Sequence, residues 1–426
     1  MSSKVPPPRG MRDFLPANTA RRRSVIDMMI SAARHRGFQE VQAPSLEKIE
    51  RLKSDQGGEN ENMIFEVIKR GLDHNIPVPP RQIIDLGLRY DLTLPLTRFY
   101  ASNKSALPRV FKSFQTGSVW RAERPQKGRF REFTQFDLDI IGEKSIEAEV
   151  ELISAGLQIL TDLNLGESST LLVNDRRILR DIMLKAGIDP EDHPSTLITL
   201  DKNDKIGRSG VEKELKERGG LTSIQVNKLF DLIEGMENDS ENFQSSEREW
   251  YDIPYLCASL GKIHPDFEVR FSPTLVRGMG YYTGPIYEVV NNSSNKSICG
   301  GGRYDNMINK WSGDRDPAVG FSLGFERIME LLPEDWSSSH EKRLAIGYSS
   351  TKQFQEAITL QKYLLEAGVS GVSLIKKPKK IKATFFEDLS RQACDRFVDM
   401  DNIDPSLPKD VQCILEISQP ILESRD

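Results

Sequence analysis

Alternating polar and apolar positions mark residues 117–142, where two extended runs are joined by a loop rich in arginine, lysine and glycine. This pattern predicts a β-hairpin with a charged tip, because side chains alternate between the two faces of a strand. In the first run, Val119, Arg121 and Glu123 share a face. In the second run, Phe133, Gln135, Asp137 and Asp139 share one face, and Thr134, Phe136, Leu138 and Ile140 share the other. A strand with one apolar face and one face of amide and carboxylate groups predicts the floor of a site for a polar ligand.

Cationic side chains gather at the tip of this hairpin. They are Arg121, Arg124, Lys127, Arg129 and Arg131. Arginine binds phosphate through paired hydrogen bonds, so the cluster suits a ligand that carries phosphate. A solvated hairpin with ordinary surface charge is the alternative explanation for this loop taken alone.

Helical periodicity predicts several other elements. Residues 19–36 are expected to form a helix that ends at Gly37, with a buried stripe of Val25, Met28, Met29, Ala32 and Ala33. A short strand should follow at residues 38–44. Residues 144–163 predict a second amphipathic helix, and residues 176–248 predict short charged helices that form an inserted module.

A polar connector at residues 57–75 precedes the run LGLRYDLTLPLTRFYAS, which predicts a strand followed by a helix. Arg89, Asp91 and Thr93 share one face of this strand. Thr93 is placed to cap the helix, with Pro95 in its first turn. Asp91 and Thr93 could serve only to begin that helix, so a ligand role is one of two explanations.

Glycines accompany the remaining arginines of interest. Arg277 is followed by Gly278, Gly280, Tyr281 and Tyr282. The run CGGGRYDNMI places three glycines before a helix, which allows close approach of a ligand but also suits a tight turn. DPAVGFSLGFERIMELL predicts a strand and then a helix with Arg327 in its first turn. Positive charge is unfavourable there, so Arg327 is expected to meet an anion or a stacked ring.

The tail from residue 343 predicts a small α/β domain. The expected elements are strand 343–349, helix 352–367 with Phe354, Ala357, Ile358, Leu364 and Leu365 inward, strand 372–377, a helix around 387–398 and strand 413–418. A basic run contains Lys376, Lys377, Lys379 and Lys380, and Phe385 and Phe386 follow it. Cations that follow phosphates and rings that stack on bases suit an RNA contact. A solvated basic loop is equally consistent.

The composition sets limits on the class of protein. A chain of 426 residues favours two or three domains. No apolar run approaches the roughly 20 residues that span a bilayer, and the first residues lack the apolar stretch of a secretory signal, so a cytoplasmic protein is expected. The formal net charge of -5 is neutral evidence on nucleic-acid binding, because local patches decide it.

The cysteines and histidines are scattered. The cysteines are Cys257, Cys299, Cys394 and Cys413, and the histidines are His35, His74, His193, His264 and His340. None of them forms a pair at metal-ligand spacing, and no nucleophile is paired with a histidine base. We therefore expect no protein-bound metal, and chemistry that depends on arginines and carboxylates.

The hairpin run VWRAERPQKGRFREFTQFDLDIIG resembles motif 2 of the class II aminoacyl-tRNA synthetases, in the form found in histidyl-tRNA synthetases. Residues 37–44 are similar to motif 1, and GFSLGFER is similar to motif 3. RGMRDFLP, RYDLTLPLTRFYA and RGMGYYTG resemble segments of the histidyl family, so the likeness covers residues 9–332. Two positions depart from it: Gly280 stands where many members carry an acidic residue, and Asp139 stands where others have glutamate.

The resemblance implies an α/β (α+β) fold, in which an antiparallel sheet flanked by helices carries a helical insertion and a C-terminal α/β domain. The implied domains are a catalytic core at 1–175 and 251–336, an insertion at 176–250 that contacts the tRNA acceptor arm, and an anticodon-binding domain at 341–426. The implied reaction is activation of L-histidine by ATP, with Mg²⁺ bound to the ATP, and transfer to the 3′ end of tRNA(His). A homodimer through motif 1 and no membrane association are also implied.

The resemblance also implies roles for individual residues. Arg121 would bridge the substrate carboxylate and the α-phosphate, and Arg277 would contact the same phosphate from the other side. The histidine site would place Asp91, Thr93 and Gln135 around the α-amino group, and Asp139, Tyr281 and Tyr282 around the imidazole. Leu92, Arg121 and Arg277 would complete it. The ATP site would comprise Arg121, Phe133 and Arg327 around the adenine and α-phosphate, Glu123 at the adenine edge and Arg129 on the outer phosphates.

Two other classes of function stay open at this level. One is a non-catalytic paralogue, such as the regulatory subunit of ATP phosphoribosyltransferase. The presence of Arg121, Arg277 and Arg327 together with a C-terminal domain argues against it. The other is a synthetase-like enzyme with a different acceptor, or an interaction protein, which only the divergent tail favours.

Overall fold

A computed structural model describes most of the chain. The described residues are 5–53, 63–70, 83–125, 129–238, 252–277, 281–313, 316–334, 336, 343–367, 369, 371–391, 394–403, 414 and 418–420. The chain divides into two compact units, of which the first comprises residues 1–12 and 29–333 and the second residues 13–28 and 334–426. Most of the predicted connector at 57–75 lies outside the described residues, as do Lys127, Gly278, Gly280 and Cys413.

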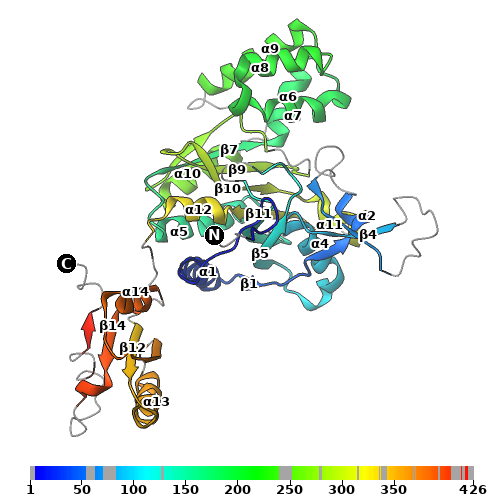
Figure 1. Cartoon of the computed structure of the whole chain (residues 1–426). Helices are drawn as coiled ribbons and strands as arrows, with labels where there is room; N and C mark the ends of the chain where they lie inside the picture. Colours follow the sequence, from blue (N-terminus) through cyan, green and yellow to red (C-terminus); the bar gives the residue numbers. More distant parts are fainter. Residues whose placement is uncertain are drawn as a thin grey trace. The chain divides into compact units, whose positions relative to one another are not determined.

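An eight-stranded sheet forms the centre of the first unit (Figure 1). In spatial order its strands are β1 (Gln39–Glu40), β5 (Phe111–Trp120), β6 (Glu132–Ile141), β11 (Ala318–Leu323), β10 (Lys296–Arg303), β9 (Pro285–Asn291), β7 (Ser169–Asp175) and β8 (Glu268–Phe271). Neighbouring strands from β5 to β7 are antiparallel, and only the two edge strands pair in parallel. The structure thus confirms the predicted antiparallel sheet.

The predicted hairpin is β5 and β6, paired in antiparallel register from Phe111 opposite Ile141 to Trp120 opposite Glu132. Next to it, β11 pairs with β6 so that Ser322 lies opposite Asp137 and Gly320 opposite Asp139. Polar or small residues therefore lie side by side on one face of these two strands. The polar faces of β6 and β11 together form a continuous polar floor.

The opposite face of the sheet is apolar and is covered by helices. These are α5 (Glu147–Asp162), α10 (Asp252–Ile263) and α12 (Phe325–Leu331). Leu138 and Phe321 are buried on this face, and Gly156 of α5 lies so close to the Phe321 ring that a side chain there would overlap it. Burial of this face leaves the polar face open for a site.

Two helices and a small sheet complete the region beside the polar floor. They are α4 (Thr93–Asn103), α11 (Asn306–Ser312), β2 (Leu46–Lys48), β3 (Glu66–Ile68) and β4 (Ile84–Leu88), with the short helices α2 (Ile49–Lys53) and η2 (Lys104–Ala106). α4 packs on α11 through a core that includes Tyr90, Leu94, Tyr100 and Ile308. The predicted strand before α4 ends at Leu88, which leaves residues 89–92 as the connection that enters the site.

Helices α1 and α6 to α9 were anticipated from periodicity. α1 (Pro16–His35) begins three residues earlier than predicted and ends before Gly37, whose φ of +79° suits glycine. Val25, Met29 and Ala33 of the predicted stripe are buried. The helices that follow β7 are α6 (Arg176–Lys185), η3 (Pro190–Asp192), α7 (His193–Leu200), α8 (Asn203–Glu217) and α9 (Ser223–Asn238), drawn in green in Figure 1.

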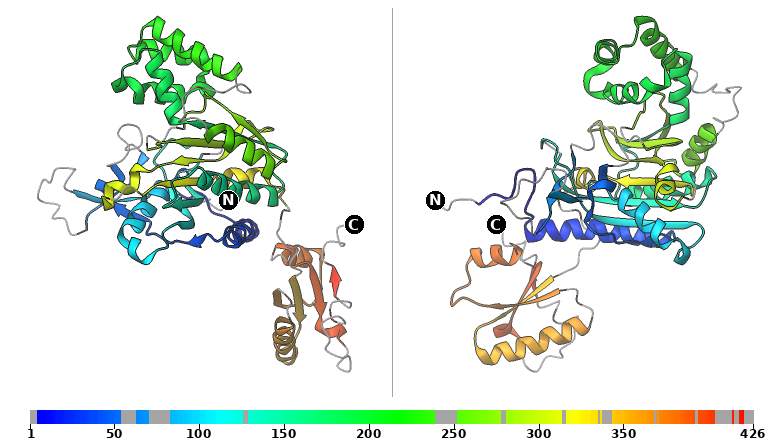
Figure 2. Two further views of the ribbon diagram at one scale, coloured as in Figure 1. Left: turned by 180° about the vertical axis from the view of Figure 1, so that it is seen from behind. Right: turned by 90° about the vertical axis from the view of Figure 1, so that its right-hand side faces the viewer.

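The second unit contains a four-stranded sheet with a helix on each face (Figure 2). Its elements are β12 (Arg343–Tyr348), α13 (Thr351–Glu366), β13 (Gly371–Lys376), α14 (Ala383–Arg391), β14 (Arg396–Asp399), η5 (Met400–Asn402) and β15 (Gln419–Pro420). The strand order is β13, β12, β14, β15, with the first three parallel. This is the α/β layering that the alternation of the tail predicts.

Three predictions within this unit are wrong. The helix expected around 387–398 ends at Arg391 and gives way to β14, because Phe397 and Val398 are buried on opposite faces of the sheet. The strand expected at 413–418 is not formed at Ile414 or Ser418, the two of its residues that the structure describes. On α13, Ala357 and Leu364 are buried as expected, whereas the side chains of Phe354, Ile358 and Leu365 are 36–47% exposed.

Within the described residues, no helix combines the length and the apolar character that crossing a membrane requires.

Candidate active site

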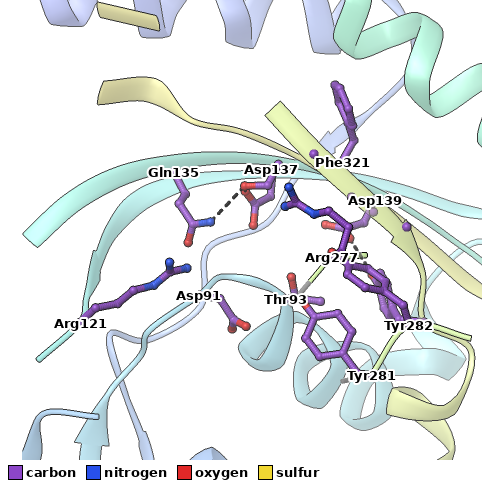
Figure 3. A pocket seen from close by; sticks show the side chains of 16 residues that line it. Asp91, Thr93, Arg121, Gln135, Asp137, Asp139, Arg277, Tyr281, Tyr282 and Phe321 are labelled. Carbon is purple, nitrogen blue, oxygen red and sulfur yellow. Dashed lines mark hydrogen bonds between the residues drawn. The ribbon is translucent and has the colours of Figure 1, made fainter. Parts of the chain in front are cut away.

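A cavity of about 160 Å³ opens on the polar floor of the main sheet (Figure 3). Its lining consists of Asp91, Thr93, Arg121, Gln135, Asp137, Asp139, Arg277, Tyr281, Tyr282, Gly300, Gly301, Gly302, Tyr304, Gly320, Phe321 and Ser322. These residues come from the β4–α4 connection, the hairpin, the segment before β9, and strands β10 and β11. The polar face predicted from the hairpin therefore faces a cavity.

Glycines give the cavity its depth. Gly300, Gly301 and Gly302 lie within β10, so they do not form a tight turn before a helix. A Cβ on Gly302 would lie 2.8 Å from the Tyr282 ring, and a Cβ on Gly320 would lie 2.5 Å from Oδ1 of Asp139. Side chains at these positions would occupy the space above the floor, so the glycines leave room for a ligand.

Carboxylates on the floor are only partly satisfied by the protein. Asp139 Oδ1 accepts a hydrogen bond of 2.6 Å from the Tyr304 hydroxyl, and Asp137 Oδ1 accepts one of 2.5 Å from Ser322 Oγ. Ser322 Oγ in turn accepts from Gln135 Nε2 at 3.0 Å. Among the described residues, Asp139 Oδ2 and Gln135 Oε1 are buried with no hydrogen-bond partner. Unsatisfied buried acceptors of this kind suit a ligand that carries N–H donors.

Burial also changes the protonation of these carboxyl groups. It raises the pKa of Asp137 to about 7, although the Ser322 hydrogen bond opposes the shift and the nearby Asp91 charge adds to it. The pKa of Asp139 is also raised well above its ordinary value, by burial and by the charge of Asp137. Neighbouring buried carboxylates resist joint ionisation, and a cationic ligand group placed beside them would favour their ionised forms.

Asp91, in the β4–α4 connection, and Thr93, the first residue of α4, both line the cavity. Asp91 Oδ1 accepts a hydrogen bond of 3.1 Å from the backbone N–H of Leu94, so Asp91 satisfies the first turn of α4. The prediction that Thr93 caps this helix is wrong, since Thr93 is already its first residue. Leu92 does not line the cavity; it is buried, and its carbonyl accepts from Gln115 Nε2 at 3.0 Å. Leu92 therefore supports the connection from behind.

Two arginines reach the cavity from different sides (Figure 3). Arg121 follows β5, and its Nε donates to the Tyr90 carbonyl at 3.1 Å. Arg277 Nη1 donates to Glu288 Oε1 of β9 at 2.6 Å. Burial alone would lower the pKa of Arg277, but the charge of Glu288 and smaller contributions from Tyr282, Asp201 and Tyr281 together outweigh it, so the pKa is raised and the cation is secure. Each guanidinium is thus held by one partner while the side chain lines the cavity.

Tyrosines close the side next to α4. The rings of Tyr281 and Tyr282 meet edge to face with centroids 4.8 Å apart, and Tyr281 meets Tyr304 at 6.2 Å. Burial raises the pKa of Tyr281 and of Tyr282, so both keep their hydroxyl protons at neutral pH. They can therefore donate hydrogen bonds to a ligand.

Apart from Arg121, the residues expected to bind the nucleotide lie outside this cavity's lining. Arg121 lies 5.0 Å above the Phe133 ring, Arg129 pairs with Glu123 at 3.6 Å, and Arg327 donates to the Ser297 carbonyl. Burial and the charge of Arg129 lower the pKa of Arg327, which places these two cations near each other. Two arginines in proximity form an electropositive region beside the cavity.

Sequence reasoning assigned no role to Asp137, Tyr304 or Ser322, although all three line the cavity. Asp137 was visible on the polar strand face. Ser322 alternates with Gly320 in β11, a period of two that could have placed both on the floor. Tyr304 follows β10 and gave no signal of its own, because only the fold brings it to Asp139.

Comparisons with known proteins decide the family. The family model described as Histidyl-tRNA synthetase matches residues 10–328. The chain belongs to this family. The histidine–tRNA ligase of Leifsonia xyli is 39% identical to it, covering 98% of this chain and 100% of that protein. The histidine–tRNA ligase of Aeropyrum pernix is 38% identical, covering 76% of this chain and 73% of that protein. These relatives support the resemblance drawn from the motifs.

Solved structures of the synthetase type share the fold. The histidyl-tRNA synthetase from Nostoc sp. PCC 7120 matches with a TM-score of 0.72 and 22% identity, covering 93% of this chain and 91% of that one. A protein from Bacillus halodurans described as an ATP phosphoribosyltransferase regulatory subunit/histidyl-tRNA synthetase matches with a TM-score of 0.73 and 22% identity, covering 92% and 96%. At this identity the likeness concerns the fold alone.

Proposed function

We propose that the cavity holds L-histidine while ATP activates it, in the reaction of a histidine–tRNA ligase. The chain is an enzyme of this class, which activates histidine and charges tRNA, as its family and its relatives over nearly the full length indicate. The observation that carries the cavity's assignment is the pairing of acidic and tyrosine groups on its floor with two arginines at its margin. The alternative of a regulatory subunit has no comparable support.

The amino-acid end of the proposal follows from the charges. The α-ammonium group would meet Asp91, Thr93 and Gln135. The imidazole would reach Asp139, whose Oδ2 has no hydrogen-bond partner among the described residues and would accept a ring N–H once the carboxyl is ionised. Tyr282 would donate to the other ring nitrogen, with Tyr281 alongside. Selection of histidine then rests on one acceptor and one donor aimed at a ring with two nitrogens.

The reaction itself is in-line attack of the histidine carboxylate on the α-phosphate of ATP. Positioning and charge neutralisation supply most of the catalysis in such a transfer, so no protein nucleophile is needed. Arg121 would bridge the carboxylate and the phosphate, and Arg277 would contact the phosphate from the other side. Their different directions of approach suit the charge that develops between them.

The nucleotide would lie beside the cavity. Phe133 and Arg327 would enclose the adenine, Glu123 would contact its edge, and Arg129 would bind the outer phosphates. Among the described residues, no group of three histidine, cysteine, aspartate or glutamate side chains could hold a metal ion. Mg²⁺ carried by the ATP phosphates fits this arrangement, and it would neutralise phosphate charge.

We further propose the finer assignments that the family implies. The acceptor would be tRNA(His), contacted by the helices between residues 176 and 250 and read at its anticodon by residues 341–426. The enzyme would act in the cytoplasm as a homodimer assembled through residues 20–46. The catalytic core would comprise residues 1–175 and 251–336. A monomer in sedimentation at micromolar concentration would contradict the dimer.

Pyrophosphate exchange into ATP tests the proposal, because it reports activation without tRNA. With each of the twenty amino acids supplied in turn, we expect exchange with histidine alone. Arg121→Ala should abolish it, while Arg270→Ala, at an exposed arginine on β8, should not change it. Exchange supported by another amino acid and not by histidine would refute the assignment of the cavity.

A further inference from the structure

The N-terminal segment of residues 8–12 contacts two elements of the proposed nucleotide site, although no role in the reaction has been given to it. It begins with a turn in which the Met11 N–H donates to the Pro8 carbonyl at 3.0 Å. The Gly10 carbonyl then accepts a hydrogen bond of 2.8 Å from the backbone N–H of Arg131, at the end of the hairpin loop. The segment is thereby joined to the loop through the backbone.

Gly10 makes this contact close. Its φ of +85° is a conformation that favours glycine, and a Cβ there would lie 2.8 Å from Cγ of Arg131. Arg131 extends the connection, because its carbonyl accepts from the Arg121 N–H at 2.8 Å and its Nε donates to the Glu123 carbonyl at 3.0 Å. The segment therefore supports both sides of the hairpin loop.

Arg12 connects the same loop to helix α12. Its guanidinium carbon lies 3.3 Å from the centroid of the Phe130 ring, and its Nη2 lies 2.5 Å from Oε2 of Glu326. Glu326 is only 8% exposed, and its other oxygen accepts from the Thr134 N–H at 3.2 Å. The next residue along the chain is Arg327. One side chain thus touches the loop that carries Glu123 and Arg129 and the helix turn that carries Arg327.

We propose that Arg12 is a positioning residue for ATP: through Phe130 and Glu326 it fixes the hairpin loop relative to the first turn of α12. The proposal rests on the proposed function, since it assumes that ATP binds between these two elements. Small displacements of binding groups are costly in such a site, because the nucleotide must be held within a fraction of an ångström of the attacking group. Arg12 need not touch the ligand to have this effect.

The histidine cavity should be largely independent of this contact. Of its lining, Arg121 and Gln135 are nearest to this contact, Arg121 through the Arg131 carbonyl and Gln135 as the residue after Thr134. The Arg121 side chain has a separate anchor on the Tyr90 carbonyl, and the Gln135 side chain has one on Ser322 Oγ. If Arg12 only stabilised the fold, its loss would weaken the binding of histidine and of ATP alike. A positioning role for ATP predicts a selective effect on the nucleotide.

The test compares Arg12→Ala and Arg12→Lys with Arg9→Ala, a control at an exposed arginine of the same end of the chain. We expect Arg12→Ala to raise the KM for ATP in pyrophosphate exchange at least about tenfold, equivalent to about 1.4 kcal/mol. The Kd for histidine measured without ATP should change less than about twofold, because Arg12 does not line the cavity and the side chains of Arg121 and Gln135 have anchors of their own there. The KM for ATP of Arg12→Lys should lie between those of the wild type and Arg12→Ala, since lysine keeps the charge but loses the planar stacking.

Hydrogen exchange provides a second readout in the same proteins. The amides of Arg131 and Thr134 should exchange faster in Arg12→Ala, whereas amides of the second unit should not change. Glu326→Gln should reproduce the KM effect if Arg12→Ala does not fold. Equal changes in both substrates, or an unchanged KM for ATP in a folded variant, would overturn the inference. Absence of histidine-dependent exchange in the wild-type enzyme would instead refute the proposed function.

Discussion

At the scale of single residues, the site is governed by charges held in a confined space. Asp137 and Asp139 lie two residues apart on β6 and are buried, yet each has only one hydrogen-bond donor from the protein among the described residues. Arg277 is fixed by Glu288, so its charge is in place before any ligand arrives. Preorganised charge of this kind favours a transition state more than a flexible side chain does.

The first prediction concerns Arg277. Arg277→Ala should lower the rate of histidine activation by roughly two orders of magnitude, since loss of one preorganised charge costs about 3 kcal/mol. The loss should appear in kcat for pyrophosphate exchange. Thermal unfolding should show a fold that persists, because Arg277 lies at the edge of the cavity and not in the apolar core. A rate within threefold of wild type, about 0.7 kcal/mol, would contradict the role.

The second prediction concerns pH. Burial raises the pKa of Asp137 to about 7, while the unfolded chain titrates near the ordinary value of about 4. Between these values the folded protein binds more protons, so the free energy of unfolding falls as pH rises from about 4 to about 7. Asp137→Asn removes the carboxyl group that binds this proton, and with it this part of the pH dependence.

Thermal or denaturant unfolding from about pH 5 to 7 should therefore show a flatter curve for Asp137→Asn than for the wild type, by up to about 1.4 kcal/mol per pH unit. Asp266→Asn, at a partly exposed acid on the opposite side of the sheet, supplies a control for the loss of a carboxylate. Parallel curves for wild type and Asp137→Asn would show that Asp137 ionises normally.

At the scale of elements, the sequence predicted strands and helices that have a regular hydrophobic period. It did not predict features that depend on contacts with other elements. The hairpin was predicted because its period of two extends over both strands. Helix α13 was predicted with the wrong inner face, since its apolar residues cover more of the helix than the sheet can bury. Thr93 was taken as the cap of α4 because a threonine precedes the helix, whereas the chain turns one residue earlier and Asp91 supplies the hydrogen bond.

The cavity shows the same limit. Its polar strand face was visible in the sequence, but the contact of Tyr304 with Asp139 joins residues 165 positions apart. No local pattern carries that information. The resemblance to a known family supplied the residue roles, which remain proposals.

The basic run between β13 and α14 illustrates how structure changes a prediction. The side chain of Lys377 is only 4% exposed and pairs with Asp399 and Asp401, so its charge is engaged within the fold. Phe385 and Phe386 pack around Phe397, so they are occupied within the core. Lys376, Lys379 and Lys380 are exposed. The proposed RNA contact would therefore depend on these three lysines.

The third prediction separates the two kinds of lysine. Joint replacement of Lys376, Lys379 and Lys380 by alanine should weaken tRNA binding and flatten its salt dependence, because each phosphate contact contributes to the slope. The melting temperature should not change. Lys377→Met should instead lower the stability of this unit, because it leaves Asp399 and Asp401 without their cationic partner. It should have little effect on tRNA binding. Filter binding across a salt series measures the effect on tRNA binding, and calorimetry measures the effect on stability. Equal salt slopes for the triple variant and the wild type would contradict the proposed RNA contact.

At the scale of the whole molecule, the chain consists of two compact units. All residues assigned to histidine and ATP lie in the first unit, with its eight-stranded sheet. The second unit has its own sheet and two apolar cores, one on each face. A unit with its own core can be removed with limited effect on the other.

The fourth prediction follows from this division. Deletion of residues 343–426 should leave histidine-dependent pyrophosphate exchange within about threefold of wild type, about 0.7 kcal/mol, because every residue proposed for activation precedes residue 333. Transfer of histidine to tRNA should fall much further, as the proposed anticodon contacts are lost. Unchanged transfer kinetics would contradict the anticodon-binding assignment. The assignment of the activation site would still stand.

The most direct test of the central claim is charging itself. The full chain, ATP, Mg²⁺ and unfractionated tRNA would be incubated with each radiolabelled amino acid, and the charged tRNA would be identified by sequencing. We predict that histidine alone is esterified, that tRNA(His) is the acceptor, and that Arg121→Ala leaves the tRNA uncharged. Attachment of a different amino acid, or no charged tRNA from an enzyme that is folded by calorimetry, would contradict the account.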